Sequence, residues 1–209
     1  MKTKKDWTGS SSSVWKALGA SNHTENEREQ DDYYATDPIA IDKLLTVEMP
    51  HTVIWKCACG GGHLSQRLKE KGFIVINTDI KDRGNNELYC RADFLAQTDK
   101  LFTDGVCYDI LTNPPYKYAK EFVLKALDLL HKGGRCYMFL KLAFLEGKAR
   151  FTELFSKYPP KCVYVFSERI QCAKNGDFES LKKTGGSAVA YAWFVWENGY
   201  TGKTYIDWI

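Results

Sequence analysis

Short apolar runs rich in β-branched residues alternate with segments of helical periodicity along most of this chain. The predicted strands lie at 52–57, 73–79, 107–112, 135–142, 161–167 and 188–196. The predicted helices lie at 63–71, 118–131 and 148–158, and a further helix opens at Asp37-Pro38. Strands that alternate with helices of about a dozen residues form a mostly parallel sheet covered on both faces. The pattern therefore predicts a doubly wound α/β fold.

Two segments depart from this alternation. Residues 168–187 are rich in Gly, Lys and Asp, so we expect a loop there, followed by a final antiparallel strand. Residues 1–32 are polar, and their few large apolar side chains are too sparse to form a core. We therefore predict an N-terminal polar arm over 1–32, partly wrapping or flexible, and a single domain over 33–209.

Composition argues against a membrane or secreted protein. No apolar run approaches the roughly 20 residues that a membrane span needs, and the basic start MKTKK has no apolar segment behind it. The seven cysteines form no CxxC pair and no ladder with His at zinc spacing. We expect a cytoplasmic protein with reduced cysteines and no bound metal.

The net charge of +3 hides an asymmetry. Residues 21–116 carry 10 basic and 16 acidic side chains, a balance of −6, whereas residues 117–183 carry 14 and 7, a balance of +7. A basic segment favours a polyanionic partner such as nucleic acid, although a solvated lysine-rich face would give the same count.

Three features follow predicted strands, at the sheet edge where such folds bind ligands. The glycine turn Gly60–Gly62 allows close backbone approach before a helix N-terminus. Asp79 ends the next strand, where an acid can hold the ribose hydroxyls of a nucleotide-like cofactor. Asn113-Pro114-Pro115-Tyr116 (NPPY) forms a sharp turn after a third strand. Together they predict a ligand site at this edge.

NPPY in this position resembles the catalytic motif of S-adenosylmethionine-dependent amino-methyltransferases, above all the N6-adenine DNA enzymes. YATDPIAIDKLL (34–45) looks like the family's cofactor motif before the first strand, and KCACGGGHLS (56–65) looks like its glycine motif. Asp93-Phe94 in RADFL matches the acid–aromatic pair beside the cofactor's adenine. The segments 7–23 and 190–209 are similar to small phage- and prophage-encoded members, so the resemblance covers almost the whole chain.

The resemblance implies a Rossmann-like class I methyltransferase fold, S-adenosyl-L-methionine as cofactor, and DNA adenine N6 as the target of site-specific methylation. It implies that the catalytic residues are Asn113, Pro114, Pro115 and Tyr116. It implies that the cofactor-binding residues are Tyr34, Thr36, Pro38, Cys59, Gly60, Gly62, Asp79, Asp93, Phe94 and Asn113.

The chemistry of an adenine amine explains the motif. Its lone pair is delocalised into the ring, and hydrogen bonds to the Asn113 side-chain oxygen and the Pro114 carbonyl would localise it. Tyr116 would stack on a base extruded from the duplex. The mechanism needs no histidine, and we interpret His63 and His131 as residues at a helix start and a helix end.

One departure concerns the cofactor. Lys56-Cys57 stands where the family often has Glu-Pro, whose acid helps to bind the positively charged end of the cofactor. Glu25, Glu27 and Asp37 are candidates to replace it.

Other functions stay open at this stage. NPPY also serves methylation of RNA adenine or of protein glutamine, whereas cytosine N4 enzymes usually have Ser at the position of Asn113. A non-catalytic cofactor- or DNA-binding module is the alternative from another class. The resembling enzymes face nucleic acid with the side of the sheet that carries the loop 168–187. We therefore expect DNA contact from Arg169, Lys174, Lys182 and Lys183, although a mobile solvated loop would have the same lysine and glycine content.

Overall fold

The computed structural model describes residues 34–101, 106–174, 176, 178 and 189–209, so the predicted arm over 1–32 lies outside the described residues. The strands are β1 (Tyr34–Thr36), β2 (Val53–Lys56), β3 (Ile74–Asp79), β4 (Cys90–Arg91), β5 (Tyr108–Thr112), β6 (Arg135–Lys141), β7 (Cys162–Val165), β8 (Cys172–Lys174), β9 (Tyr191–Glu197) and β10 (Tyr205–Trp208). The α-helices are α2 (Ile39–Leu44), α3 (His63–Glu70), α4 (Ala119–Leu129) and α5 (Lys148–Arg150). Tighter 3-10 turns lie at Phe94–Ala96, Tyr116–Tyr118 and Leu142–Leu145, and a π-helical turn lies at Phe151–Phe155.

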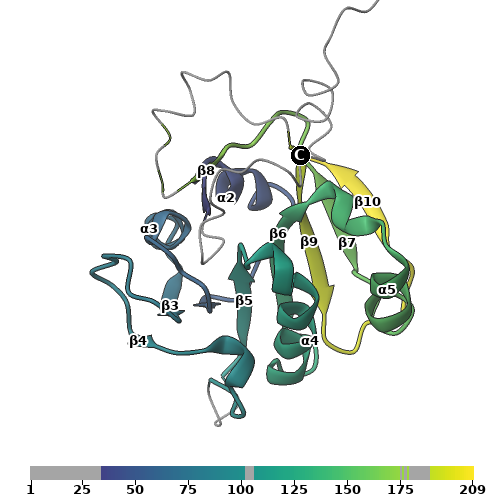
Figure 1. The fold of residues 1–209 in the computed structure, drawn as a ribbon, viewed down its shortest axis with the longest axis horizontal. Helices are drawn as coiled ribbons and strands as arrows, with labels where there is room; N and C mark the ends of the chain where they lie inside the picture. The colour runs from purple at the N-terminus through teal and green to yellow at the C-terminus, as the bar shows by residue number, and fades with distance from the viewer. Residues whose placement is uncertain (1–33, 102–105, 175, 177, 179–188) are drawn as a thin grey trace, which may run out of the picture.

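Within the described residues, eight strands form one sheet in the order β10-β7-β9-β6-β5-β2-β3-β4 (Figure 1). β2 pairs in parallel with β3 and β5, and β5 pairs in parallel with β6. β9 runs antiparallel between β6 and β7, so β7 keeps the direction of β6. The prediction of a mostly parallel sheet with an antiparallel strand is confirmed.

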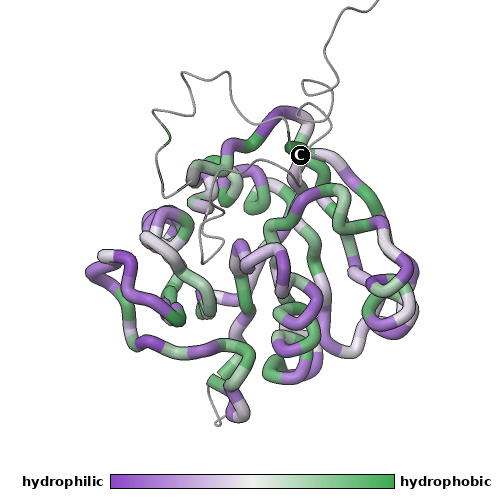
Figure 2. Tube along the Cα trace, in the orientation of Figure 1, coloured by the Kyte–Doolittle hydropathy of each residue, from purple (hydrophilic) through white to green (hydrophobic). Residues whose placement is uncertain are grey.

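Helices cover both faces of this sheet. On β2, Ile54 packs into a cluster with α2 and α3, while the neighbouring Trp55 packs into a cluster with α4, because alternate strand residues point to opposite faces. In Figure 2, α3 and α4 each carry both hydrophobic and hydrophilic residues, as expected of helices with one face on a sheet. None of the helices that the structure describes is long and apolar enough to cross a membrane.

Four strands were not predicted from the sequence: β1, β4, β8 and β10. The expectation of a loop over 168–187 is wrong for β8, which pairs antiparallel with β1 through Tyr34↔Lys174 and Thr36↔Cys172. β10 follows the antiparallel strand and pairs in parallel with β7, so β9 is not the last strand of the chain. β1, β4 and β8 are two or three residues long, too short to show periodicity, so only their partners in the sheet define them.

Candidate functional site

A cavity of about 460 Å³ lies at the carboxyl ends of β2, β3 and β5. In the sheet, β3 lies on one side of β2, and the chain later returns to place β5 on the other side of β2. This reversal of strand order opens a crevice between neighbouring loops, where ligands of doubly wound folds bind. The volume lies within the range of small-molecule sites.

Most of the predicted site residues meet at this cavity. It is lined by Tyr34, Thr36, Cys59, Gly60, Asp79, Asp93, Phe94, Asn113 and Pro115. Pro38, Gly62, Pro114 and Tyr116 do not line it. The sequence analysis did not single out Lys117, Tyr118 or Arg83 for the site, although all three line the cavity. Their only sequence signal was nearness to NPPY or to Asp79.

The glycine turn between β2 and α3 is shaped by hydrogen bonds to β3. The Cys59 N–H donates to the Thr78 carbonyl at 3.1 Å, and the Gly60 N–H donates to Asp79 Oδ2 at 2.8 Å. Gly62 has a φ of +86°, and a Cβ there would lie 3.0 Å from the Asn85 side chain. Gly62 is therefore required for the conformation of the turn, while Gly60 presents backbone to the cavity.

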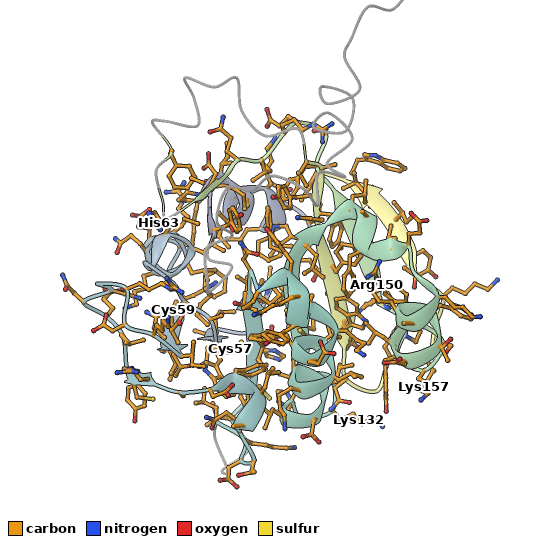
Figure 3. The ribbon with its side chains drawn as sticks, viewed as in Figure 1. Cys57, Cys59, His63, Lys132, Arg150 and Lys157 are labelled. Atoms are coloured by element: carbon orange, nitrogen blue, oxygen red, sulfur yellow. The ribbon has the colours of Figure 1, made fainter. Side chains whose placement is uncertain are left out.

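Figure 3 shows Cys57, Cys59 and His63 around this turn. Burial raises the pKa of both thiols, so the two cysteines are neutral at physiological pH. His63 is the first residue of α3, which confirms its interpretation as a helix-start residue, and burial lowers its pKa. It also lines the cavity, and its ring contacts Phe178 edge-on at 5.6 Å. Cys57, Cys59 and His63 therefore add no negative charge to the cavity wall.

Asp79 ends β3 with its carboxylate nearly buried, at 6% exposure for the residue. Besides the Gly60 N–H, it accepts the Lys81 N–H at 3.0 Å on Oδ1. Each oxygen holds one backbone donor and retains acceptor capacity toward the cavity. The carboxylate is thus fixed in orientation, with room to accept further donors from a ligand.

Asp93 and Phe94 form the wall that adjoins β4. The Asp93 side chain accepts the Leu95 N–H at 3.0 Å and so caps the 3-10 turn that begins at Phe94. Phe94 is 2% exposed and packs edge-on against Trp55 at 5.3 Å between ring centroids. Asp93 therefore places a polar group beside the rigid apolar ring of Phe94.

Asn113 is held by β1. Its Nδ2 donates to the Tyr34 carbonyl at 3.0 Å and to Thr36 Oγ1 at 2.9 Å. Two acceptors account for both hydrogens of the amide nitrogen, which fixes the orientation of the Oδ1 acceptor on the other branch. Strand β1 was not predicted, yet it orients the first residue of NPPY.

Tyr116 lies deeper than its predicted stacking role requires. Its ring stacks near those of Tyr34 and Tyr191, each at 6.2 Å between centroids, and its hydroxyl lies 3.7 Å from Cys172 Sγ. Burial raises its pKa well above the usual value. Lys141 Nζ lies 4.8 Å from the ring centroid. In this structure Tyr116 supports the turn rather than facing the cavity.

Lys56 is a buried cation in the cavity wall. It is 2% exposed, and burial lowers its pKa to about 8, against the opposing influence of Cys59, Cys57 and Asp79. Asp37 does not line the cavity: its Oδ1 accepts the Ile39 N–H at 3.0 Å, and the N-cap of α2 is Pro38 rather than Asp37. The remaining candidate acids, Glu25 and Glu27, lie outside the described residues.

The predicted DNA-contacting loop is described only in part, and the described part includes a neighbour of NPPY. Cys172 on β8 lies next to Asn113, and Arg169 is exposed. Lys182 and Lys183 lie outside the described residues. The basic excess of 117–183 is also spread wider than the site. Figure 3 shows three of its members on the side of α4 and α5, away from Cys59, and these are Lys132, Arg150 and Lys157.

Comparison with solved structures shows the fold. A candidate class I S-adenosylmethionine-dependent methyltransferase from Listeria monocytogenes is 13% identical, with a TM-score of 0.54, over 92% of this chain and 70% of that one. A predicted O-methyltransferase from Agrobacterium tumefaciens is 12% identical, with a TM-score of 0.53, over 82% and 85%. A candidate hemolysin from Lactococcus lactis is 11% identical, with a TM-score of 0.56, over 80% and 89%. No protein-family model matches the sequence, and no curated protein matches it significantly.

The chain has the Rossmann-like class I methyltransferase fold, with its ligand cavity at the switch point of the sheet.

Proposed function

We propose that this protein transfers the methyl group of S-adenosylmethionine to the exocyclic N6 amine of adenine in DNA. The observation that carries the proposal is the fixed amide of Asn113, which directly follows the parallel strand β5 and lines the cavity. An oriented acceptor beside a cofactor-sized cavity is what activation of a planar amine requires. The structure-level likeness to methyltransferases supports the same class of reaction.

The cavity fits the cofactor by its donor and acceptor set. Asp79 offers carboxylate lone pairs for a pair of ribose hydroxyls, and Gly60 allows close backbone approach. Phe94 offers an apolar surface for a purine, and Asp93 offers an acceptor beside it. When bound, S-adenosylmethionine supplies a methyl group on a positively charged sulfur.

The chain's own residues would then act on the target amine. Asn113 Oδ1 would accept one amine hydrogen, and the Pro114 carbonyl, held by the fixed φ of proline, would accept another. Pro115 and Phe122 line the cavity with apolar surface and limit water around the amine. These contacts localise the nitrogen lone pair and direct it into the cavity.

In this proposal Tyr118, rather than Tyr116, stacks on the base. Tyr118 lines the cavity and is 43% exposed, with Lys117 Nζ 4.6 Å from its ring centroid. Base–aromatic stacking contributes about 1–3 kcal/mol per base. Tyr118→Ala should therefore raise the KM for DNA roughly 5- to 150-fold, while Tyr118→Phe should retain most of the affinity.

The matched control for this prediction is Tyr89→Ala, because Tyr89 is 76% exposed and does not line the cavity. Steady-state kinetics at saturating cofactor would measure each KM. An unchanged KM for Tyr118→Ala would show that this ring does not hold the base.

The buried Lys56 makes a second prediction, which concerns pH. Raising the pH through about 8 removes the proton of Lys56 and with it the repulsion toward a cationic sulfur in the cavity. S-adenosylmethionine should therefore bind more tightly at about pH 9 than at about pH 7. Isothermal titration calorimetry across this range would measure the effect.

S-adenosylhomocysteine is the matched ligand for that measurement. It has the same amino acid group but a neutral sulfur, so the difference between the two ligands isolates the sulfonium charge. In Lys56→Met, the pH dependence of this difference should disappear. The same pH dependence in parent and variant would mean that Lys56 does not face the cofactor.

The test of the function is incubation with labelled S-adenosylmethionine and matched DNA, RNA and protein samples, followed by nucleoside and amino acid analysis. N6-methyladenine in DNA alone supports the proposal. Label in RNA adenine or in protein glutamine would move the assignment to that substrate. Cofactor binding with no transfer to any sample would indicate a non-catalytic module.

A further inference from the structure

Two histidines and a cysteine meet at the opposite ends of the strands from the cavity. His51 precedes β2, Cys107 precedes β5, and His131 follows α4. β2 and β5 pair in parallel from Val53↔Tyr108 onward, which brings their starting residues together. Since the three residues are far apart in the sequence, no ligand spacing could have indicated them.

The three side chains are close enough to share an ion. One ring nitrogen of His51, one of His131 and the Sγ of Cys107 all lie within 4.8 Å of one another. The two imidazole rings are 5.7 Å apart at an angle of 67°. The Nδ1 of His131 is buried and has no hydrogen-bond partner among the described residues. A buried ring nitrogen without a partner is costly unless something binds it.

Asp109 orients the other histidine. Its carboxylate is fully buried. It accepts the backbone N–H of His51 at 2.7 Å and the backbone N–H of Arg135 at 2.7 Å, and it lies 2.9 Å from the ring nitrogen Nδ1 of His51. A carboxylate on one nitrogen leaves the other nitrogen as the basic, outward-facing one. Metal-binding histidines almost always have such a partner.

The ligand set selects the metal. One thiolate and two imidazoles suit Zn²⁺, which takes four ligands in a tetrahedron at about 2.0–2.1 Å from nitrogen and about 2.3 Å from sulfur. Those bond lengths place ligand atoms roughly 3.3–3.6 Å apart, so the present side chains would close by at most about 1.5 Å. The His51 side chain is 39% exposed and Cys107 is exposed, so neither is enclosed by packing.

We propose that His51, Cys107 and His131 bind one zinc ion, with water as the fourth ligand and Asp109 as the carboxylate that orients His51. The ion would join the starts of two central strands to the end of α4. The site lies at the opposite ends of the strands from the cavity and does not depend on the proposed methyl transfer.

The experiment uses the full chain, stripped of metal by a chelator and titrated with Zn²⁺ alone. We expect one zinc ion per chain in the parent, and a melting temperature that rises with added zinc. Cys107→Ser should lower zinc affinity by more than the roughly 10- to 100-fold that loss of an outer partner costs. Cys90→Ser is the matched control, because Cys90 is also exposed and lies on β4.

Two further measurements identify the ligands. Cobalt(II) in place of zinc should give a thiolate charge-transfer band in the parent and in Cys90→Ser, and none in Cys107→Ser. His131→Gln should weaken zinc binding while its circular dichroism spectrum stays that of the parent. Failure of the parent to bind zinc, or equal zinc affinities for the parent and Cys107→Ser, would overturn the site.

Discussion

Asn113→Ala should lower the rate of methyl transfer by about 10²–10³ while cofactor affinity stays nearly unchanged. The variant removes the oriented oxygen that would accept a hydrogen of the target amine, an interaction that strengthens as the nitrogen attacks. It leaves the cofactor contacts at Asp79 and Phe94 in place. Single-turnover kinetics on DNA, with cofactor affinity from calorimetry, would separate the two quantities.

The structure adds a sharper variant at the same position. Asn113→Asp keeps the size of the side chain but loses the Nδ2 hydrogens that now bond to the Tyr34 carbonyl and Thr36 Oγ1. We expect it to be impaired as well, because its second oxygen would face the Tyr34 carbonyl, which cannot donate a hydrogen bond. Asn86→Ala, in the exposed loop between β3 and β4, should behave as the parent. Parent-like turnover by Asn113→Ala would reject NPPY as the catalytic turn.

Much of the scaffold could be predicted because it depends on local pattern. The apolar run before NPPY becomes β5, which is buried along its whole length, and the stripe through Phe122 and Ala126 becomes the buried face of α4. Asp79 could be placed at the cavity because parallel strands bring their carboxyl ends to one edge. The class of fold and the position of the crevice followed from these elements.

The parts that could not be predicted depend on residues far apart in the chain. The expectation that Tyr116 stacks on a base took no account of Tyr191, 75 residues away, whose ring now stacks beside it. Burial of Lys56 depends on how β2 packs between its neighbours. The sequence alone does not show that a charged residue will be buried. The partners of Asn113 lie on β1, 77 and 79 residues away, a strand too short to show periodicity.

Asp79→Ala should weaken S-adenosylmethionine binding by roughly 10²–10⁴-fold. Charge-assisted hydrogen bonds from two ribose hydroxyls would each contribute about 1.5–3 kcal/mol, and each 1.4 kcal/mol is tenfold in affinity. The variant also deprives the Gly60 and Lys81 N–H groups of their acceptor. Hydrogen bonds to a charged group contribute about 1.5–3 kcal/mol each, so some loss of stability is expected as well.

Three variants distinguish a binding effect from a folding effect. Asp79→Asn keeps an oxygen that can accept one backbone N–H but loses the charge, so it should fold like the parent and still bind weakly. Asp82→Ala removes an exposed acid of the same loop, whose Oδ1 accepts the Gly84 N–H, and should leave affinity unchanged. Calorimetry gives the affinities, and denaturant titration gives the free energies of unfolding. Equal affinities for Asp79→Ala and the parent, with both folded, would mean that the ribose does not lie at the end of β3.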